Sequence, residues 1–165
     1  MLGGSPGGDM RGAVRRFGAG LVLCAALAGC GDEDGGEGLQ TRTLRLVERA
    51  ETDAVADLEP SGDSAGDVLT FVNPLFDEAN TAQVGTDQGY CVRVQAGASW
   101  ECTWTAFLDD GQLTVAGPFY DTRDSTLAIT GGTGAFQGAH GQMRLEFRDP
   151  QGKAFNFIYE VLLAD

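Results

Sequence analysis

The sequence predicts an all-β domain, an eight-stranded antiparallel up-and-down β-barrel, and three observations carry this prediction. After residue 40, short runs rich in β-branched and aromatic residues alternate with Gly/Asp turns, and no stretch keeps a helical periodicity. Gly is abundant, with 25 residues, whereas Pro is scarce at 5, which favours turns and bulges over long helices. The links between strands are mostly short, and closure into a barrel removes the exposed sheet edges.

Eight strands can be placed in order along the chain. They are expected at residues 41–49, 67–76, 83–95, 99–108, 112–117, 126–130, 138–148 and 154–163. Asp-Asp-Gly at 109–111 and Pro-Gln-Gly at 150–152 are strong turn sequences, and the glycines at 131–134 fit a tight turn with a barrel bulge. The long link at 51–66 is either a lid or a loose connection. A barrel of this size is filled by its own side chains or holds one small ligand.

The N-terminal residues have the pattern of a bacterial lipoprotein signal. Three arginines precede an uncharged apolar run at 17–27, which is too short to span a bilayer, since that takes roughly 20 residues. Leu-Ala-Gly-Cys, ending at Cys30, resembles the lipobox whose cysteine is acylated. We predict a signal peptide at 1–29 and a lipid on Cys30 that anchors the protein outside the cytoplasm, at the bacterial cell membrane. A plain signal peptide is the alternative.

Residues 30–40 are acidic and rich in Gly, and they predict a flexible tether. The barrel domain would then cover 41–165. The spacing of an EF-hand calcium loop is absent from the tether.

Charge and histidine content exclude several classes of function. The formal net charge of −13 repels phosphates, so we expect no nucleic-acid partner. The chain has one histidine, His140, which rules out a site built from several histidines of this chain. We expect neither a metal site nor a cofactor.

Cys91 and Cys102 are the two cysteines of the predicted domain. A hairpin folded about residues 96–97 brings them opposite each other, which suits a cross-strand disulfide in an oxidising compartment. A free catalytic thiol is the alternative.

Glu48 is the informative polar residue of the first strand. Strand alternation places it on the same face as Leu44 and Leu46, so its carboxyl should point inward among apolar side chains. An inward carboxyl must be paired, protonated or solvated, and Asn73 of the second strand could be its partner. The functional interpretation is a general acid or base with a raised pKa. The alternative is a strand-end Glu that leans into water.

From 41 to 163 the chain resembles the allene oxide cyclase barrel family and, more distantly, the dirigent proteins. The segments that carry the resemblance lie at 44–48, 67–75, 89–92, 111–118 and 128–141. The resemblance implies an eight-stranded barrel, often trimeric, so a homotrimer is expected. It also implies an isomerase that closes an unstable epoxide into a ring inside an apolar cavity.

Carried over residue by residue, the resemblance makes Glu48 the catalytic acid and Asn73 a residue that binds a catalytic water. The resemblance implies a ligand cavity lined by Leu69, Phe71, Cys91 and Phe119. Ala50 stands where the plant enzymes have a second water-binding Asn.

Three hypotheses follow for the function. The first is a lipid-anchored barrel that binds a small apolar or amphipathic ligand, with isomerase or cyclase activity through Glu48. The second is a non-catalytic, lipocalin-like binding lipoprotein. The third is a dirigent-like structural barrel with a solid interior. In that case four aromatic residues, Trp100, Trp104, Phe107 and Phe157, would fill the lumen.

Overall fold

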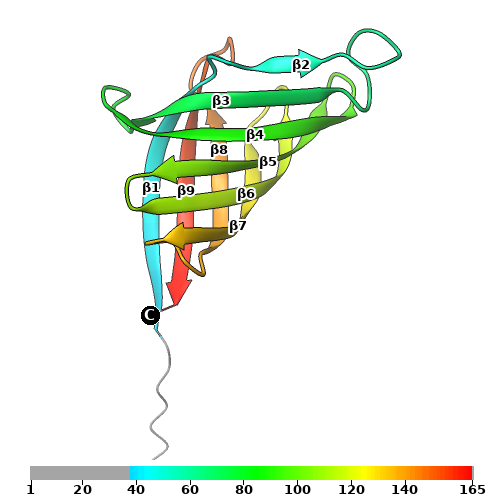
Figure 1. The fold of residues 1–165 in the computed structure, drawn as a ribbon. Helices are drawn as coiled ribbons and strands as arrows, with labels where there is room; N and C mark the ends of the chain where they lie inside the picture. The colour runs from blue at the N-terminus through cyan, green and yellow to red at the C-terminus, as the bar shows by residue number, and fades with distance from the viewer. Residues whose placement is uncertain (1–37, 165) are drawn as a thin grey trace, which may run out of the picture. The chain divides into compact units, whose positions relative to one another are not determined.

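The computed structural model describes residues 38–164, which fold as a closed eight-stranded antiparallel β-barrel without helices (Figure 1). The predictions of a signal peptide at 1–29 and of a lipid on Cys30, with most of the tether, lie outside the described residues. The strands are β1 (Leu39–Arg49), β2 (Ala54–Ala56), β3 (Val68–Asp77), β4 (Gln83–Gln95), β5 (Ser99–Leu108), β6 (Gly111–Tyr120), β7 (Ser125–Gly134), β8 (His140–Phe147) and β9 (Ala154–Ala164).

The barrel is formed by β1 and by β3 to β9, each paired with its neighbour in the chain. β1 closes the barrel because it pairs with β9 along its whole length and with β3 at Leu46–Glu48, as Figure 1 shows where β1 runs beside β9. The up-and-down topology predicted from the sequence is therefore confirmed. Within the described part of the chain, there is no helix long and apolar enough to cross a membrane.

Strand bounds differ from the predictions at a few ends. β1 begins at Leu39, so Leu39 and Gln40 are strand residues and not part of the tether. β7 continues to Gly134, so the tight turn expected at 131–134 was placed wrongly and lies after β7, at 135–138. The expected bulge is present where the pairing of β6 with β7 shifts between Thr114 and Val115. The strand can run through these glycines because the shifted pairing accommodates one extra residue of β7, Thr130, which has no ladder partner in β6.

The link at 51–66 contains the short strand β2, which the sequence did not predict. β1 pairs with only the last residues of β3, so the first half of β3 has a free edge. β2 pairs with that edge, with Ala54 opposite Thr70 and Ala56 opposite Val68. The link is therefore partly held in the sheet and is not loose throughout.

Aromatic side chains fill the middle of the lumen. Trp104 stacks on Phe157 with ring centroids 5.5 Å apart and meets Phe71 edge to face at 6.0 Å. Gly89 lies opposite Trp104 in the ladder, and a Cβ there would collide with the Trp104 Cβ. Trp100 also faces inward, whereas Phe107 lies on the outer face because its neighbour Ala106 points into the core. Three of the four aromatic residues expected in a solid barrel are thus interior.

Cys91 and Cys102 form a disulfide, as the hairpin predicted. They are directly opposite each other in the ladder between β4 and β5. Both are buried and both face the core, so the bond ties two neighbouring strands on the lumen side.

Candidate functional site

Glu48 occupies the inner face of β1, next to the strand end. Glu48 is only 5% exposed, and it lies in the segment of β1 that pairs with β3 to close the barrel. The Asn73 side-chain amide donates a hydrogen bond from Nδ2 to Glu48 Oε1 at 2.7 Å. The inward carboxyl and its Asn73 partner, both predicted from strand alternation, therefore meet in the structure.

Asn73 is held in one orientation by its other contacts. Its Oδ1 accepts hydrogen bonds from the backbone amides of Glu51 and Thr52, each at 3.0 Å. Its Nδ2 also donates to Asp53 Oδ1 at 2.8 Å. Because backbone amides can only donate, the amide oxygen of Asn73 must face them, and both donors of Nδ2 are left for the two carboxylates.

Burial raises the pKa of Glu48 from 4.5 to about 7. The hydrogen bond from Asn73 lowers this pKa, and the nearby Asp53 carboxylate raises it, but the loss of hydration dominates. Glu48 is thus a carboxyl that exists in both protonation states near neutral pH, which suits general acid–base chemistry.

Asp87 is a third carboxyl of the same region, and the sequence analysis missed it. It lies opposite Asn73 in the ladder between β3 and β4, and its side chain is fully buried at 0% exposure. Burial and the charge of Glu48 raise the pKa of Asp87 well above its ordinary value. Strand alternation could have found it, because Asp87 shares a strand face with Cys91.

Three polar groups in the lumen make no hydrogen bond of good geometry within residues 38–164. They are both carboxyl oxygens of Asp87, the indole Nε1 of Trp104 and the hydroxyl of Tyr159. Burial, with the charges of Asp87 and Glu48, raises the pKa of Tyr159, so its hydroxyl stays protonated. Buried polar groups are rarely left unpaired, so the interior has unused hydrogen-bonding capacity beside Glu48.

A cavity of about 50 Å³ opens beside Glu48 and Asp53. Its other walls are the apolar side chains of Leu69, Phe71, Cys91, Phe119, Leu145, Phe155 and Phe157. The four residues that the family resemblance placed at the cavity therefore lie around it, although whether they contact a ligand stays a prediction. The sulfur of Cys91 is part of the disulfide, so it is not a free catalytic thiol.

None of the described side chains that line the cavity is positively charged. The neighbouring arginine of β1, Arg49, points outward, where it stacks on Phe76 and donates to Asn80. Arg93 is the buried arginine, and it pairs with Asp63 and Asp121. His140 begins β8 as an exposed residue. Over residues 38–164, no three His, Cys, Asp or Glu side chains are arranged to hold a metal ion.

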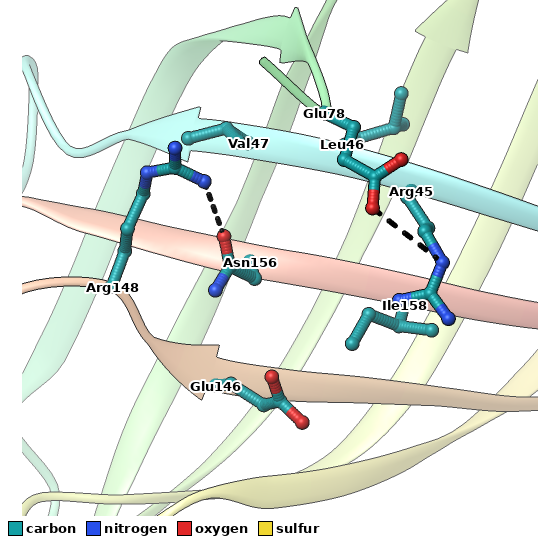
Figure 2. A pocket seen from close by; sticks show the side chains of 8 residues that line it. All are labelled: Arg45, Leu46, Val47, Glu78, Glu146, Arg148, Asn156 and Ile158. Carbon is teal, nitrogen blue, oxygen red and sulfur yellow. Dashed lines mark hydrogen bonds and ion pairs between the residues drawn. The ribbon is translucent and has the colours of Figure 1, made fainter. Parts of the chain in front are cut away.

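A larger hollow of about 290 Å³ lies on the outer face of β1, β8 and β9 (Figure 2). Figure 2 shows Arg45 beside Glu78 and Arg148 donating to Asn156. The remaining charged residue, Glu146, pairs with Arg144 of the same strand. The buried Val47 and Ile158 of this hollow are apolar. Because these charged groups already have partners, we take the acid-lined cavity as the candidate site.

Comparison with known proteins agrees with this architecture. Residues 44–160 match the sequence model of the allene oxide cyclase family. That range contains Glu48, Asn73 and every residue that lines the cavity.

Several solved structures share the fold. A pyocyanin demethylase superimposes with a TM-score of 0.63 at 24% identity, over 72% of this chain and 99% of its own. The pterocarpan synthase dirigent protein GePTS1 gives a TM-score of 0.67 at 18% identity, over 79% of this chain and 94% of its own. AbnU, an exo-specific intermolecular Diels-Alderase, gives a TM-score of 0.63 at 12% identity, over 76% of this chain and 99% of its own. Likeness at these identities shows the shared barrel.

Proposed function

The chain belongs to the allene oxide cyclase family, and from this premise we propose an exported, lipid-anchored barrel that binds a small apolar or amphipathic ligand in its lumen. In this proposal the barrel is an isomerase or cyclase, and Glu48 exchanges a proton with the bound ligand. The observation that carries it is one buried carboxyl, Glu48, with a pKa raised to about 7 at the edge of an apolar cavity.

The chemistry follows from the two forms of this carboxyl. The protonated form can donate a proton to a ligand atom that gains negative charge, and the carboxylate can take a proton back in a later step. Asn73 stabilises the carboxylate form because its Nδ2 donates to Oε1. The aromatic walls would restrict the ligand to conformations that can close a ring.

The size of the cavity sets how a ligand can enter. Pockets that enclose whole drug-sized ligands measure roughly 300 to 1,000 Å³. The cavity beside Glu48 measures about 50 Å³, so it would receive the reacting end of a ligand. The rest of the ligand would extend past Asp53 toward solvent, because Asp53 is an exposed residue at the cavity.

An untargeted screen of metabolites against the full chain, read out by liquid chromatography with mass spectrometry so that isomers are separated, tests this function. The proposal expects a bound small molecule and its conversion to an isomer of the same mass. The Glu48→Gln variant should fold but lose conversion, while Glu101→Gln, which changes an exposed glutamate of β5, should retain it. Unchanged turnover in Glu48→Gln would remove Glu48 from the mechanism.

A non-catalytic barrel is the second candidate, and the small cavity is the observation that favours it. Trp104, Phe157 and Phe71 already pack against one another in the lumen. A binding lipoprotein would copurify with a ligand that it leaves unchanged, whereas a structural barrel would copurify with none. The same chromatography with mass spectrometry separates both from an isomerase, because an isomer elutes at a different time from the unchanged ligand.

Lipid anchoring is proposed from the lipobox at Cys30 and has its own test. Wild-type protein should sediment with membranes after cell lysis, and the Cys30→Ser variant should appear in the soluble fraction. A wild-type chain that stays soluble would contradict the anchor while leaving the proposed lumen chemistry open to its own experiment.

A further inference from the structure

We propose that the cavity beside Glu48 selects a ligand whose buried end is an aromatic or conjugated cation, held by the carboxylates of Glu48 and Asp53 and by the surrounding phenylalanine rings. This inference rests on the proposed ligand-binding function and narrows it to a substrate class. It also assigns Glu48 the role of base, because a carboxylate paired with a cation accepts a proton.

The polar groups that line the cavity are acidic. Glu48 and Asp53 both line it, and the two carboxylates share one neutral donor group, the Nδ2 of Asn73. Every described residue that lines the cavity is acidic or apolar. Two carboxylates in an apolar wall favour a positive partner and disfavour a negatively charged one.

Asp87 is a buried acid that the proposed mechanism leaves unused. It is fully buried, it faces the lumen beside Asn73, and no side chain of the described part of the chain donates to its carboxyl. The backbone amides of Asn73 and Asp87 lower its pKa by less than burial raises it. Its carboxyl lies close enough to Glu48 for their charges to influence each other. A positive group next to Glu48 would offset the repulsion between these acids, which no protein cation in the cavity does.

The walls of the cavity are largely aromatic. Four phenylalanine rings surround the carboxylates, namely Phe71, Phe119, Phe155 and Phe157. Phe119 and Phe155 meet edge to face at 5.8 Å within this wall. Aromatic faces attract cations, and flat apolar ligands pack well against such rings.

Three probes of similar shape test the inference on the full chain. N-methylpyridinium is a cation, toluene is its neutral counterpart, and benzoate is the anionic one. Perturbations of the Glu48 and phenylalanine NMR signals report binding in the lumen. We expect N-methylpyridinium to bind at least about tenfold more tightly than toluene, and benzoate not to bind. Preferential binding of toluene or benzoate would overturn the inference and leave ligand binding intact.

The pH dependence of binding and the affinities of single-residue variants identify the groups that hold the cation. The titratable groups that face Glu48 are Asp53, Asp87 and Tyr159. Affinity for N-methylpyridinium should rise as pH rises through about 7, as Glu48 loses its proton, while toluene affinity stays flat.

Glu48→Gln should weaken cation binding about tenfold or more and spare toluene binding. Asp53→Asn changes an exposed residue, so it should fold and lower cation affinity in the same direction. Glu101→Gln removes the same charge at a surface position and should leave both affinities unchanged. If Glu101→Gln lost as much cation affinity as Glu48→Gln, the effect would come from the net charge of the protein. That result would overturn the proposed cation site. Failure of all three probes to bind would overturn the inference together with the proposed ligand-binding function.

Discussion

Asn73 determines the environment of Glu48 because every polar atom of its side chain is engaged. Its oxygen accepts from the backbone of Glu51 and Thr52, and its nitrogen donates to Glu48 and Asp53. One side chain therefore ties the end of β1, the following link and β3 together. The same bonds favour the charged form of Glu48.

Asn73→Leu, which keeps the branched shape and the number of heavy atoms, should raise the pKa of Glu48 above its wild-type value of about 7, because the hydrogen bond that lowers it is lost. Stability should fall by about 1–2 kcal/mol, since two backbone amides lose their acceptor. Carboxyl NMR titration and urea denaturation measure the two effects. A pKa that stays the same or falls would show that the hydrogen bond does not set it.

Glu48 also makes stability depend on pH. Its pKa is raised in the folded state, so the folded protein binds a proton that the unfolded chain has released above about pH 4.5. This contribution therefore weakens folding progressively as pH rises from about 4.5 to about 7. Relative to Glu48→Gln, the wild type should lose free energy of unfolding over this range. If the free energy of unfolding changed with pH in the same way in both proteins, that result would contradict the raised pKa of Glu48.

At the scale of elements, the β4–β5 hairpin is tied by the disulfide between Cys91 and Cys102 on its inner face. Cys91→Ala together with Cys102→Ala should lower the free energy of unfolding by about 2–5 kcal/mol, because the unfolded chain gains freedom and the core loses sulfur contacts. Reducing agent should likewise lower the denaturant concentration at which half of the wild-type protein is unfolded. Equal midpoints for oxidised and reduced wild type would show that the bond adds no stability.

The link between β1 and β3 is organised by Asp67. Its carboxylate accepts hydrogen bonds from the backbone amides of Leu58 and Ser64, both at 2.9 Å, and these bonds lower the pKa of Asp67. Asp67→Ala should speed amide hydrogen exchange in residues 57–66 at least tenfold, because these amides lose their acceptor. Exchange in β5 and β6 is the internal control. An unchanged rate in 57–66 would show that other contacts hold the link.

Strand positions and the disulfide could be predicted from the sequence because both follow from local pattern. Alternation placed Glu48 and Asn73 on inner faces, and the turn sequences at 109–111 and 150–152 lie between strands as expected. The glycines at 131–134 were expected to turn but belong to β7. β2 could not be predicted, since it forms only because β1 leaves part of β3 unpaired. Phe107, which the solid-barrel hypothesis placed in the lumen, lies on the outer face because β5 alternates and Ala106 takes the inner position.

The candidate site was predicted in part. The predicted carboxyl, its amide partner and four cavity residues come together in the structure. Asp53 was missed because it belongs to a link whose course the sequence does not specify, and Asp87 because it stands in a polar stretch of β4. The cavity volume depends on how the aromatic side chains pack, which the pattern of strands leaves undetermined.

At the scale of the whole domain, Glu48 is buried because the barrel is closed. Its backbone lies opposite Leu75 in the short pairing of β1 with β3 that completes the cylinder, so the candidate site is built at the closure. Opening of this seam would expose Glu48 to water and return its pKa toward the ordinary value near 4.5. Fold and proposed chemistry are thus linked through one strand pair.

The most direct test is an NMR titration of the Glu48 carboxyl in the folded protein, assigned by comparison with Glu48→Gln. The account predicts a midpoint near 7, and a return to about 4.5 when urea unfolds the barrel. A midpoint near 4.5 in the folded protein would contradict it, because Glu48 would then be an ordinary solvated carboxylate.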